Sequence, residues 1–330
     1  MPAARRPHRR TSPAALAGLL RPRLAAERGQ VLFTSVLMMF VVLGAVGLVV
    51  DVGSWYHQQR VEQAAADAAA LAGAQALPDD PGEAVQLAVQ YAKDNGGGLT
   101  AGDVAISTDR STNDTISVRV TRSAPTYFAQ LFGLHSVTVR STAAARSDGI
   151  SAADYVAPIA VSSEHPMLQC TPSPCSDPTE LDMIDLKQQG SSDAAGNFSL
   201  LDLRIGAGGV VGDSTLADWM EHGYDQSMPL GVYTSVTGSK FNGNSFAQAL
   251  RDRYGSEVLF PVYKPPILKS GSNAEFNIIG WVGFSITGSA GGGNSGKVYG
   301  SFTHFIAHGL QASDPGSQAD FGVRAIQLVR

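Results

Sequence analysis

The longest apolar run of the chain covers residues 30–50, QVLFTSVLMMFVVLGAVGLVV, and contains no charged residue. As a helix rising 1.5 Å per residue it is roughly 30 Å long, about the thickness of the hydrocarbon core of a bilayer. Arg28 precedes the run closely and Asp51 follows it directly. The alternative is a cleaved secretory signal, which normally has a shorter apolar region and ends in a small-x-small site. LVVDVG offers no good site of that kind, so we predict a retained transmembrane helix at residues 30–50.

Alanine dominates the next segment, residues 51–77, with nine alanines and one glycine among the thirteen residues 64–76. Alanine is the strongest helix former, so the helix is expected to continue until Pro78 stops it. Small residues spaced by four let helix backbones approach closely. The candidates for such packing are Ala64, Ala65, Ala68, Ala69, Ala72 and Gly73. Two interpretations stay open: the helix packs on its own neighbouring unit, or on the helix of a partner.

Residues 78–150 change from a helical period to a period of two. GEAVQLAVQYAKDN (82–95) groups its apolar residues at helical spacing and is followed by glycines that end a helix. Alternation predicts strands at 103–108, 115–122 and 136–145, and a short helix is expected after Pro125. The segment therefore predicts a small α+β unit with helices on one face of a short sheet.

Residues 151–330 consist of short apolar runs separated by Gly, Ser, Asn and Pro. The clearest runs are 155–161, 257–264, 276–288 and 297–310. This pattern is typical of a mostly antiparallel β domain with long loops. The predicted fold class is thus α+β: one N-terminal transmembrane helix extended into a long helix, a small α+β unit, and a β-rich extracytoplasmic domain.

Charge is distributed unevenly around the apolar run. Residues 1–29 carry seven arginines and one glutamate, a net charge of +6, whereas the whole chain carries −5, which leaves −11 for residues 51–330. An arginine-rich flank is typical of the cytoplasmic side of a membrane helix. The arginines could instead bind nucleic acid, but four prolines interrupt them and an apolar span follows. We therefore predict a cytoplasmic tail at 1–29, membrane lipid as a partner, no nucleic acid, and the bulk of the chain outside.

The only two cysteines, Cys170 and Cys175, lie in the sequence CTPSPC. Outside the cytoplasm oxidation is permitted, so a local disulfide is expected. Two unpaired thiols are the alternative interpretation. No second pair of Cys or His lies nearby at ligand spacing, so a metal site is not expected.

Two motifs come close to known sites but do not complete them. GGGNSGK (291–297) lacks the Ser or Thr that follows the lysine of a P-loop, and Val298 opens a strand where a helix is required. His304 and His308 have the spacing that binds zinc on a helix, but the alternation around them predicts a strand, which would place them about 13 Å apart. The first motif is interpreted as a hairpin loop and the second as ordinary histidines.

Nucleophilic catalysis is not indicated either. No G-x-S-x-G elbow occurs, and no histidine has a neighbouring pattern that would make it a catalytic base. We predict no catalytic residue, no metal and no cofactor.

The stretch Glu27–Ala74 combines RGQ before the span, DVG closing it, a linker with aromatic residues and arginine, and the AADAAALAGA run. In this order the pieces resemble the N-terminal module of TadG-like proteins of the tight-adherence (Flp) pilus machinery. PTYFAQLFGLHSVTVRSTAAA (125–145) resembles the same proteins more weakly, as do GNFSLLDL (196–203), EVLFPVYK and FNIIGWVGFSITG.

The resemblance implies a single-pass envelope protein related in plan to pilin-like subunits, with no enzymatic activity and no cofactor. A pilin-type cleavage after Gly29 would make Gln30 the first mature residue and place Thr34 at the fifth position, where pilins carry glutamate. Gly29 and Gln30 are therefore kept as a candidate processing site with one departure from the pattern.

The hypothesis is a membrane-anchored scaffold or anchor for Tad/Flp pilus assembly or a related secretion apparatus. Its expected partners are other pilus-assembly or envelope proteins, with a homo-oligomer as a further possibility. The alternatives are a membrane-tethered binding module for cell-envelope material and, more weakly supported, a tethered hydrolase.

Overall fold

The computed structural model describes residues 27–170, 173–175, 182–187, 198–208, 210–269, 274–292, 295–307 and 320–329. The predicted tail at 1–29 lies almost wholly outside these ranges, as do His308 and part of the GNFSLLDL segment. The chain divides into two compact units. The first takes the chain up to Arg60 together with Arg122–Val139, and the second takes Val61–Thr121 and Arg140–Arg330.

Four α-helices occur in the part of the chain that the structure describes: α1 (Glu27–Ala74), α2 (Pro81–Asp94), α3 (Asp213–His222) and α4 (Asn244–Asp252). The helix α1 joins the predicted span and the alanine-rich segment into one element of 48 residues. The helix α2 begins where Asp80 accepts the Glu83 amide at 2.8 Å and Pro81 occupies the first turn, an arrangement favoured at helix starts. The predicted second helix at 82–95 is thus confirmed within one residue at each end.

The strands lie mostly in two sheets. Their bounds are β1 (Val104–Ser107), β2 (Thr115–Pro125), β3 (Ser136–Gly149), β4 (Ala152–Ala153), β5 (Val161–Ser162), β6 (Asp182–Asp185), β7 (Leu201–Asp202), β8 (Met228–Pro229), β9 (Gly231–Ser235), β10 (Glu257–Tyr263), β11 (Glu275–Gly292), β12 (Ser295–Thr303), β13 (Phe305–Ala307) and β14 (Val323–Val329). The predicted fold class, an α+β chain with a long N-terminal helix and a β-rich remainder, is confirmed.

The first sheet has the strand order β1-β2-β3-β14-β13. The strands β1 and β2 pair antiparallel with Val104 opposite Val118, as the alternation predicted. The sheet also contains β14, which pairs antiparallel with β3 and places Arg324 opposite Gly149. A strand from the end of the sequence therefore completes the sheet that begins at residue 104, a long-range pairing that the sequence pattern did not indicate.

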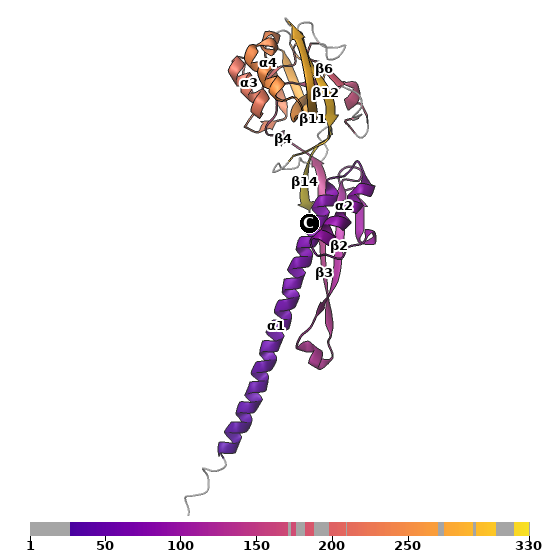
Figure 1. The fold of residues 1–330 in the computed structure, drawn as a ribbon, viewed down its shortest axis with the longest axis vertical. Helices are drawn as coiled ribbons and strands as arrows, with labels where there is room; N and C mark the ends of the chain where they lie inside the picture. The colour runs from indigo at the N-terminus through magenta and orange to yellow at the C-terminus, as the bar shows by residue number, and fades with distance from the viewer. Residues whose placement is uncertain are drawn as a thin grey trace, which may run out of the picture. The chain divides into compact units, whose positions relative to one another are not determined.

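The second sheet has the order β5-β10-β11-β12-β6, with β9 pairing both β11 and β7. Its centre is the long antiparallel pair β11 and β12, and Figure 1 shows α3 and α4 together on one side of it. Neither helix was predicted from the sequence. The predicted strand at 297–310 is also divided, because β12 and β13, in its described part, belong to different sheets.

Among the described residues of the second unit, two hydrophobic clusters form the interior. The larger surrounds β10, β11 and β12 and includes the fully buried rings of Phe260, Phe284 and Phe302. The smaller lies between the alanines of α1 and α2 and the apolar face of β2, which contributes Ile116 and Val118. Small alanine side chains thus bring α1, α2 and the first sheet into close contact.

Candidate functional site

The first part of α1 presents an apolar surface with almost no protein cover. Of residues 29–50, only Gly47 is buried, and large side chains such as Val49 are up to 70% exposed. The most apolar window of the helix has a mean hydropathy of 2.5. A helix that is apolar all round is buried in a protein core or in a membrane. Within the described residues, α1 is the one helix long and apolar enough to cross a membrane.

Asp51, at the end of the apolar run, binds the loop between β2 and β3. We call residues 126–135 the tip loop. One carboxylate oxygen of Asp51 accepts the amide of Tyr127 at 2.7 Å, and the other accepts the amide of Ala129 at 2.6 Å and that of Phe128 at 3.1 Å. The side chain is only 1% exposed.

These amides open the short 3-10 helix η2 (Ala129–Phe132) of the tip loop. A helix start leaves amides without partners inside the helix, and a carboxylate is a strong acceptor for them. Asp51 thus caps a helical turn 78 residues away in the sequence. A short helix was predicted after Pro125, and the structure has a four-residue 3-10 helix there, which begins only at Ala129.

Gly47, one turn before Asp51, contacts the same loop. A Cβ atom placed on Gly47 would lie 2.7 Å from Cγ of Phe128, closer than real Cβ contacts allow. A Cβ on Gly44 would meet nothing within 4 Å. Glycine is therefore required at position 47 for the ring of Phe128 to lie against the helix.

The alanine-rich part of α1 packs inside the second unit. Ala66, Ala69, Ala70 and Ala74 are fully buried and share a cluster with Ala84, Ala88 and Ala92 of α2. A Cβ on Gly73 would lie 2.8 Å from the backbone oxygen of Ala84 and 2.5 Å from Cδ1 of Ile116. The two helices therefore approach too closely at this point for any side chain.

The six predicted packing residues separate into two groups. Ala65, Ala69, Ala72 and Gly73 are buried, whereas Ala64 is exposed and Ala68 is half-buried. The backbones that the buried group meets belong to the chain itself. The sequence left open whether the alanine-rich helix packs on its own chain or on a partner. The structure shows packing on its own chain.

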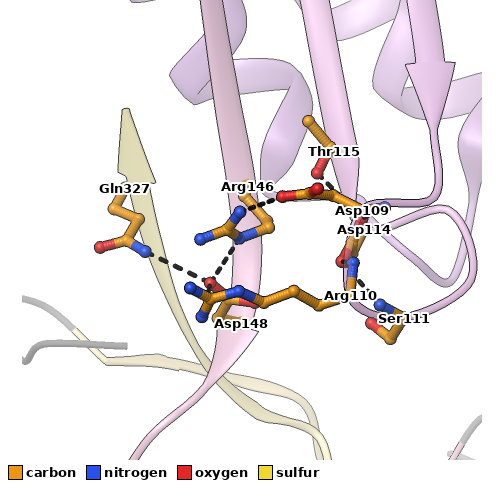
Figure 2. A network of polar contacts seen from close by, with 8 residues as sticks. All are labelled: Asp109, Arg110, Ser111, Asp114, Thr115, Arg146, Asp148 and Gln327. Carbon is orange, nitrogen blue, oxygen red and sulfur yellow. Dashed lines mark hydrogen bonds and ion pairs between the residues drawn. The ribbon is translucent and has the colours of Figure 1, made fainter. Parts of the chain in front are cut away.

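A polar network holds the loop between β1 and β2 (Figure 2). Asp114 is fully buried and accepts the amides of Asp109, Arg110 and Ser111 at 2.7–2.9 Å and the hydroxyl of Thr115 at 2.9 Å. Burial by itself raises the pKa of the Asp114 carboxyl, but the four hydrogen bonds stabilise its charged form. They outweigh burial and lower the pKa below its usual value.

The same network connects this loop with β3 and β14. Asp148 accepts Nε of Arg146 at 2.6 Å, Nη1 of Arg110 at 3.4 Å and Nε2 of Gln327 at 3.2 Å, while Arg146 also pairs with Asp109 (Figure 2). Burial lowers the pKa of Arg146, but the carboxylates of Asp148 and Asp109 outweigh it and raise the pKa. Because the Gln327 contact comes from β14, the network helps to hold that strand against β3.

Arg324 forms a second link from β14. Its guanidinium donates to Asp79 at 2.6 and 3.1 Å and to Asp320 at 2.8 and 3.0 Å, and its side chain is only 7% exposed. Asp79 lies between α1 and α2, so one arginine joins this connection to the last strand. His304 lies 3.4 Å from the same Asp79 carboxylate.

The remaining candidates from the sequence lie in separate places. The structure joins Cys170 to Cys175, with their Cα atoms 5.9 Å apart, within the usual range for a disulfide. Gly291 and Lys297 lie on the facing strands β11 and β12, so the described part of this segment is antiparallel sheet and not the start of a helix. No group of three metal-ligating side chains occurs among the described residues.

Gly29 and Gln30 are helical and exposed, and a Cβ on Gly29 would meet nothing within 4 Å. A groove of about 930 Å³ lies elsewhere. It is lined by residues of α1, β1, β2, β3 and β14, including Asp67 and Arg119, and by Asp103 just before β1.

No role was predicted from the sequence for five residues that the structure places in these contacts: Asp51, Gly47, Asp114, Arg146 and Arg324. Asp51 could have been singled out because it is a charged residue directly after an apolar run. Gly47 could have been singled out because it is a glycine inside a helix, where no turn requires it. Nothing in the local sequence around Asp114, Arg146 or Arg324 indicates their long-range partners.

These features define a class of protein: an α+β chain whose N-terminal helix could anchor it in a membrane and whose tip loop contacts that helix at the end of the apolar run. Residues 29–76 match the Tad family model, described as Flp pilus-assembly TadE/G-like. The predicted TadG-like resemblance is confirmed for this segment, and it indicates involvement in Flp pilus assembly. No curated protein and no solved structure matches the chain.

Proposed function

We propose that this protein is a membrane-anchored structural component of Flp-type pilus assembly, acting as a scaffold or anchor without enzymatic activity or a cofactor. The single observation that carries the proposal is the match of residues 29–76 to the TadE/G-like family. The exposed apolar surface of α1 supports the anchoring part, because such a surface is unfavourable in water.

The proposal includes a topology. The tail at 1–29 lies in the cytoplasm, 30–50 spans the membrane once, and the helix 51–77 with the parts 78–150 and 151–330 lies outside. The charges support this orientation, since the flank before the span carries the arginines and the remainder is acidic. The disulfide between Cys170 and Cys175 agrees with an oxidising compartment.

Partners follow from the same proposal. The helix 30–50 contacts membrane lipid, and other pilus-assembly or envelope proteins, or a second copy of the chain, contact the outer parts. Ala64 and Ala68 are the members of the alanine set with exposed surface left for such a partner.

Deletion of the gene in the native cell tests the function. We expect surface fibres to disappear and to return when the full chain is supplied. A version that starts at residue 51 behind a cleavable secretion signal should not restore them, because it lacks the anchor. The matched control replaces residues 30–50 by an unrelated apolar helix of equal length.

Retained fibres together with lost binding of the protein to isolated cell wall would support the binding module instead. Restoration of fibres by the unanchored version would contradict an anchoring role. The N-terminal sequence of the mature membrane protein decides between an intact tail and a chain that starts at Gln30.

A further inference from the structure

The tip loop exposes an unusual number of large apolar side chains for a surface loop. Five are exposed: Tyr127 (54%), Phe128 (44%), Leu131 (79%), Phe132 (90%) and Leu134 (44%). The loop is nevertheless well hydrogen-bonded, for example from the Leu134 amide to the Ala129 oxygen at 3.2 Å and from the Leu131 amide to the Phe128 oxygen at 3.0 Å. An ordered loop that exposes contiguous apolar side chains is typical of an interaction surface.

The loop lies at one end of the apolar run of α1. Asp51 caps its helical turn, and Phe128 lies against Gly47. Because a helix rises 1.5 Å per residue, Gly47 lies about 5 Å inside the end of the apolar run at Val50. If residues 30–50 cross the bilayer, the loop is held at the level where headgroups meet acyl chains.

The amino-acid composition of the tip loop and its surroundings is typical of the boundary between headgroups and acyl chains. No Asp, Glu, Lys or Arg occurs from residue 123 to residue 139, and Arg122 and Arg140 flank this stretch. Trp55 and Tyr56 follow Asp51 by about one turn of α1. Tryptophan and tyrosine are enriched at membrane–water interfaces, where their rings are partly apolar and partly polar.

We propose that the tip loop inserts the side chains of Tyr127, Phe128, Leu131 and Phe132 into the outer leaflet of the bilayer beside the protein's own helix. This inference rests on one part of the proposed function, namely that α1 spans the membrane. The chain then contacts the membrane at two points, a span and an interfacial loop. A single helix can tilt in a bilayer, whereas a second contact fixed to it by Asp51 restricts the tilt.

Lipid is the expected partner of the tip loop because the apolar surface of the loop is continuous with that of the proposed membrane span in α1. Val46, Leu48 and Val49, on either side of Gly47, are 52%, 62% and 70% exposed. The ring of Phe128 covers Gly47 between them and so extends the same apolar surface onto the loop. Aromatic and leucine side chains on an uncharged element are the composition that partitions to the headgroup and acyl boundary.

Spin labels on the full chain test the proposal. The sequence has only two cysteines, which the disulfide closes, so an added cysteine gives one labelling position. Phe132→Cys and, as a second site, Leu131→Cys are suitable because both side chains are highly exposed and their replacement should not affect folding. Val42→Cys in the apolar run and Val210→Cys, 87% exposed in the other unit, serve as references for lipid and water.

Each labelled protein is reconstituted into vesicles of phosphatidylethanolamine and phosphatidylglycerol. Collision of the label with oxygen, which concentrates in lipid, is compared with collision with a water-soluble nickel chelate. We expect the ratio of oxygen to nickel collisions at positions 131 and 132 to exceed that at position 210 by several-fold and to approach that at position 42.

A ratio at 131 and 132 equal to that at 210, with a lipid value at 42, would overturn the loop insertion and leave the anchor intact. Protection of the loop labels from both reagents would also overturn it, because a protein and not lipid would then cover the loop. A water-like value at position 42 would overturn the anchor itself and the insertion with it.

Discussion

The Asp51 carboxylate accepts the amide of Ala129 at 2.6 Å, although the two residues are 78 positions apart. Asp51 belongs to α1 directly after the apolar run, and Ala129 opens the turn η2 of the tip loop. Charge-assisted hydrogen bonds of this kind are short and strong. Through them, the end of the apolar helix determines where the exposed aromatic loop lies.

Replacing Asp51 should free the tip loop. Asp51→Ala removes the acceptor for three amides, and hydrogen bonds to a charged group are stronger than those between neutral groups. Hydrogen exchange of the full chain in detergent should become faster at residues 127–129 and unchanged in α2. Asp51→Asn keeps one acceptor oxygen and should give an intermediate rate. Unchanged protection in the alanine variant would show that the cap does not hold the loop.

Gly47 and Gly44 provide a matched pair on the same helix. Gly47→Leu should displace the ring of Phe128, because even a Cβ atom would lie 2.7 Å from it, whereas Gly44→Leu meets nothing within 4 Å. Both changes favour the helix by removing glycine, by about 1 kcal/mol. Faster hydrogen exchange in the tip loop is therefore expected for Gly47→Leu only. Equal behaviour of the two variants would argue against the Phe128 contact.

Ala69 and Ala64 test the packing of the alanine-rich segment. Ala69 is fully buried and Ala64 is exposed, so Ala69→Leu should lower the free energy of unfolding by about 1–3 kcal/mol or more, and Ala64→Leu by almost nothing. Thermal unfolding of the purified full chain measures both. If Ala64→Leu leaves stability unchanged but prevents fibre formation in the cell, that exposed face contacts a partner. Equal melting temperatures for Ala69→Leu and the wild type would contradict the internal contact.

The lowered pKa of Asp114 predicts a loss of stability in acid. A carboxyl whose pKa is lower in the folded than in the unfolded chain stabilises the fold above the unfolded value, about 3.9. That contribution is lost as the pH falls from this value through the folded pKa. Asp114→Asn should therefore lower the melting temperature at pH 7 and reduce its further decrease between pH 5 and pH 2. The exposed Asp225→Asn serves as the control, and a pH profile of Asp114→Asn that matches the wild type would count against this role.

Arg324 should be sensitive even to a change that keeps its charge. Its fork-shaped guanidinium donates to both Asp79 and Asp320, a geometry that the single ammonium of lysine cannot reproduce. Arg324→Lys should lower the melting temperature, and Arg324→Met, which removes all of these hydrogen bonds from Asp79 and Asp320, should lower it further. Arg251→Lys on the exposed side of α4 is the control. Hydrogen exchange should locate the loss in β14, and protection of β14 as in the wild type would contradict the link.

Local sequence patterns were sufficient to predict the helices and strands that pack against segments near them in the chain, or against no other segment. The apolar run, the alanine-rich continuation, α2 and the pairing of β1 with β2 all follow from periodicity and from proline and glycine breaks. The helices α3 and α4 were missed because their short amphipathic patterns lie among many loop-forming residues. The role of β14 was missed because its partner β3 lies about 180 residues away, beyond any local pattern.

The sequence by itself determined that this chain has one long apolar helix with an arginine-rich flank, a TadE/G-like segment, and a β-rich remainder, since length, charge and period are properties of neighbouring residues. Only the tertiary structure decided that the alanine-rich segment packs on its own α2 and β2, and that Asp51 and Gly47 hold the tip loop. A row of small residues shows that a close contact is possible but not with which surface. The surface is selected by the shape and hydrogen-bonding groups of segments that meet only after the chain has folded.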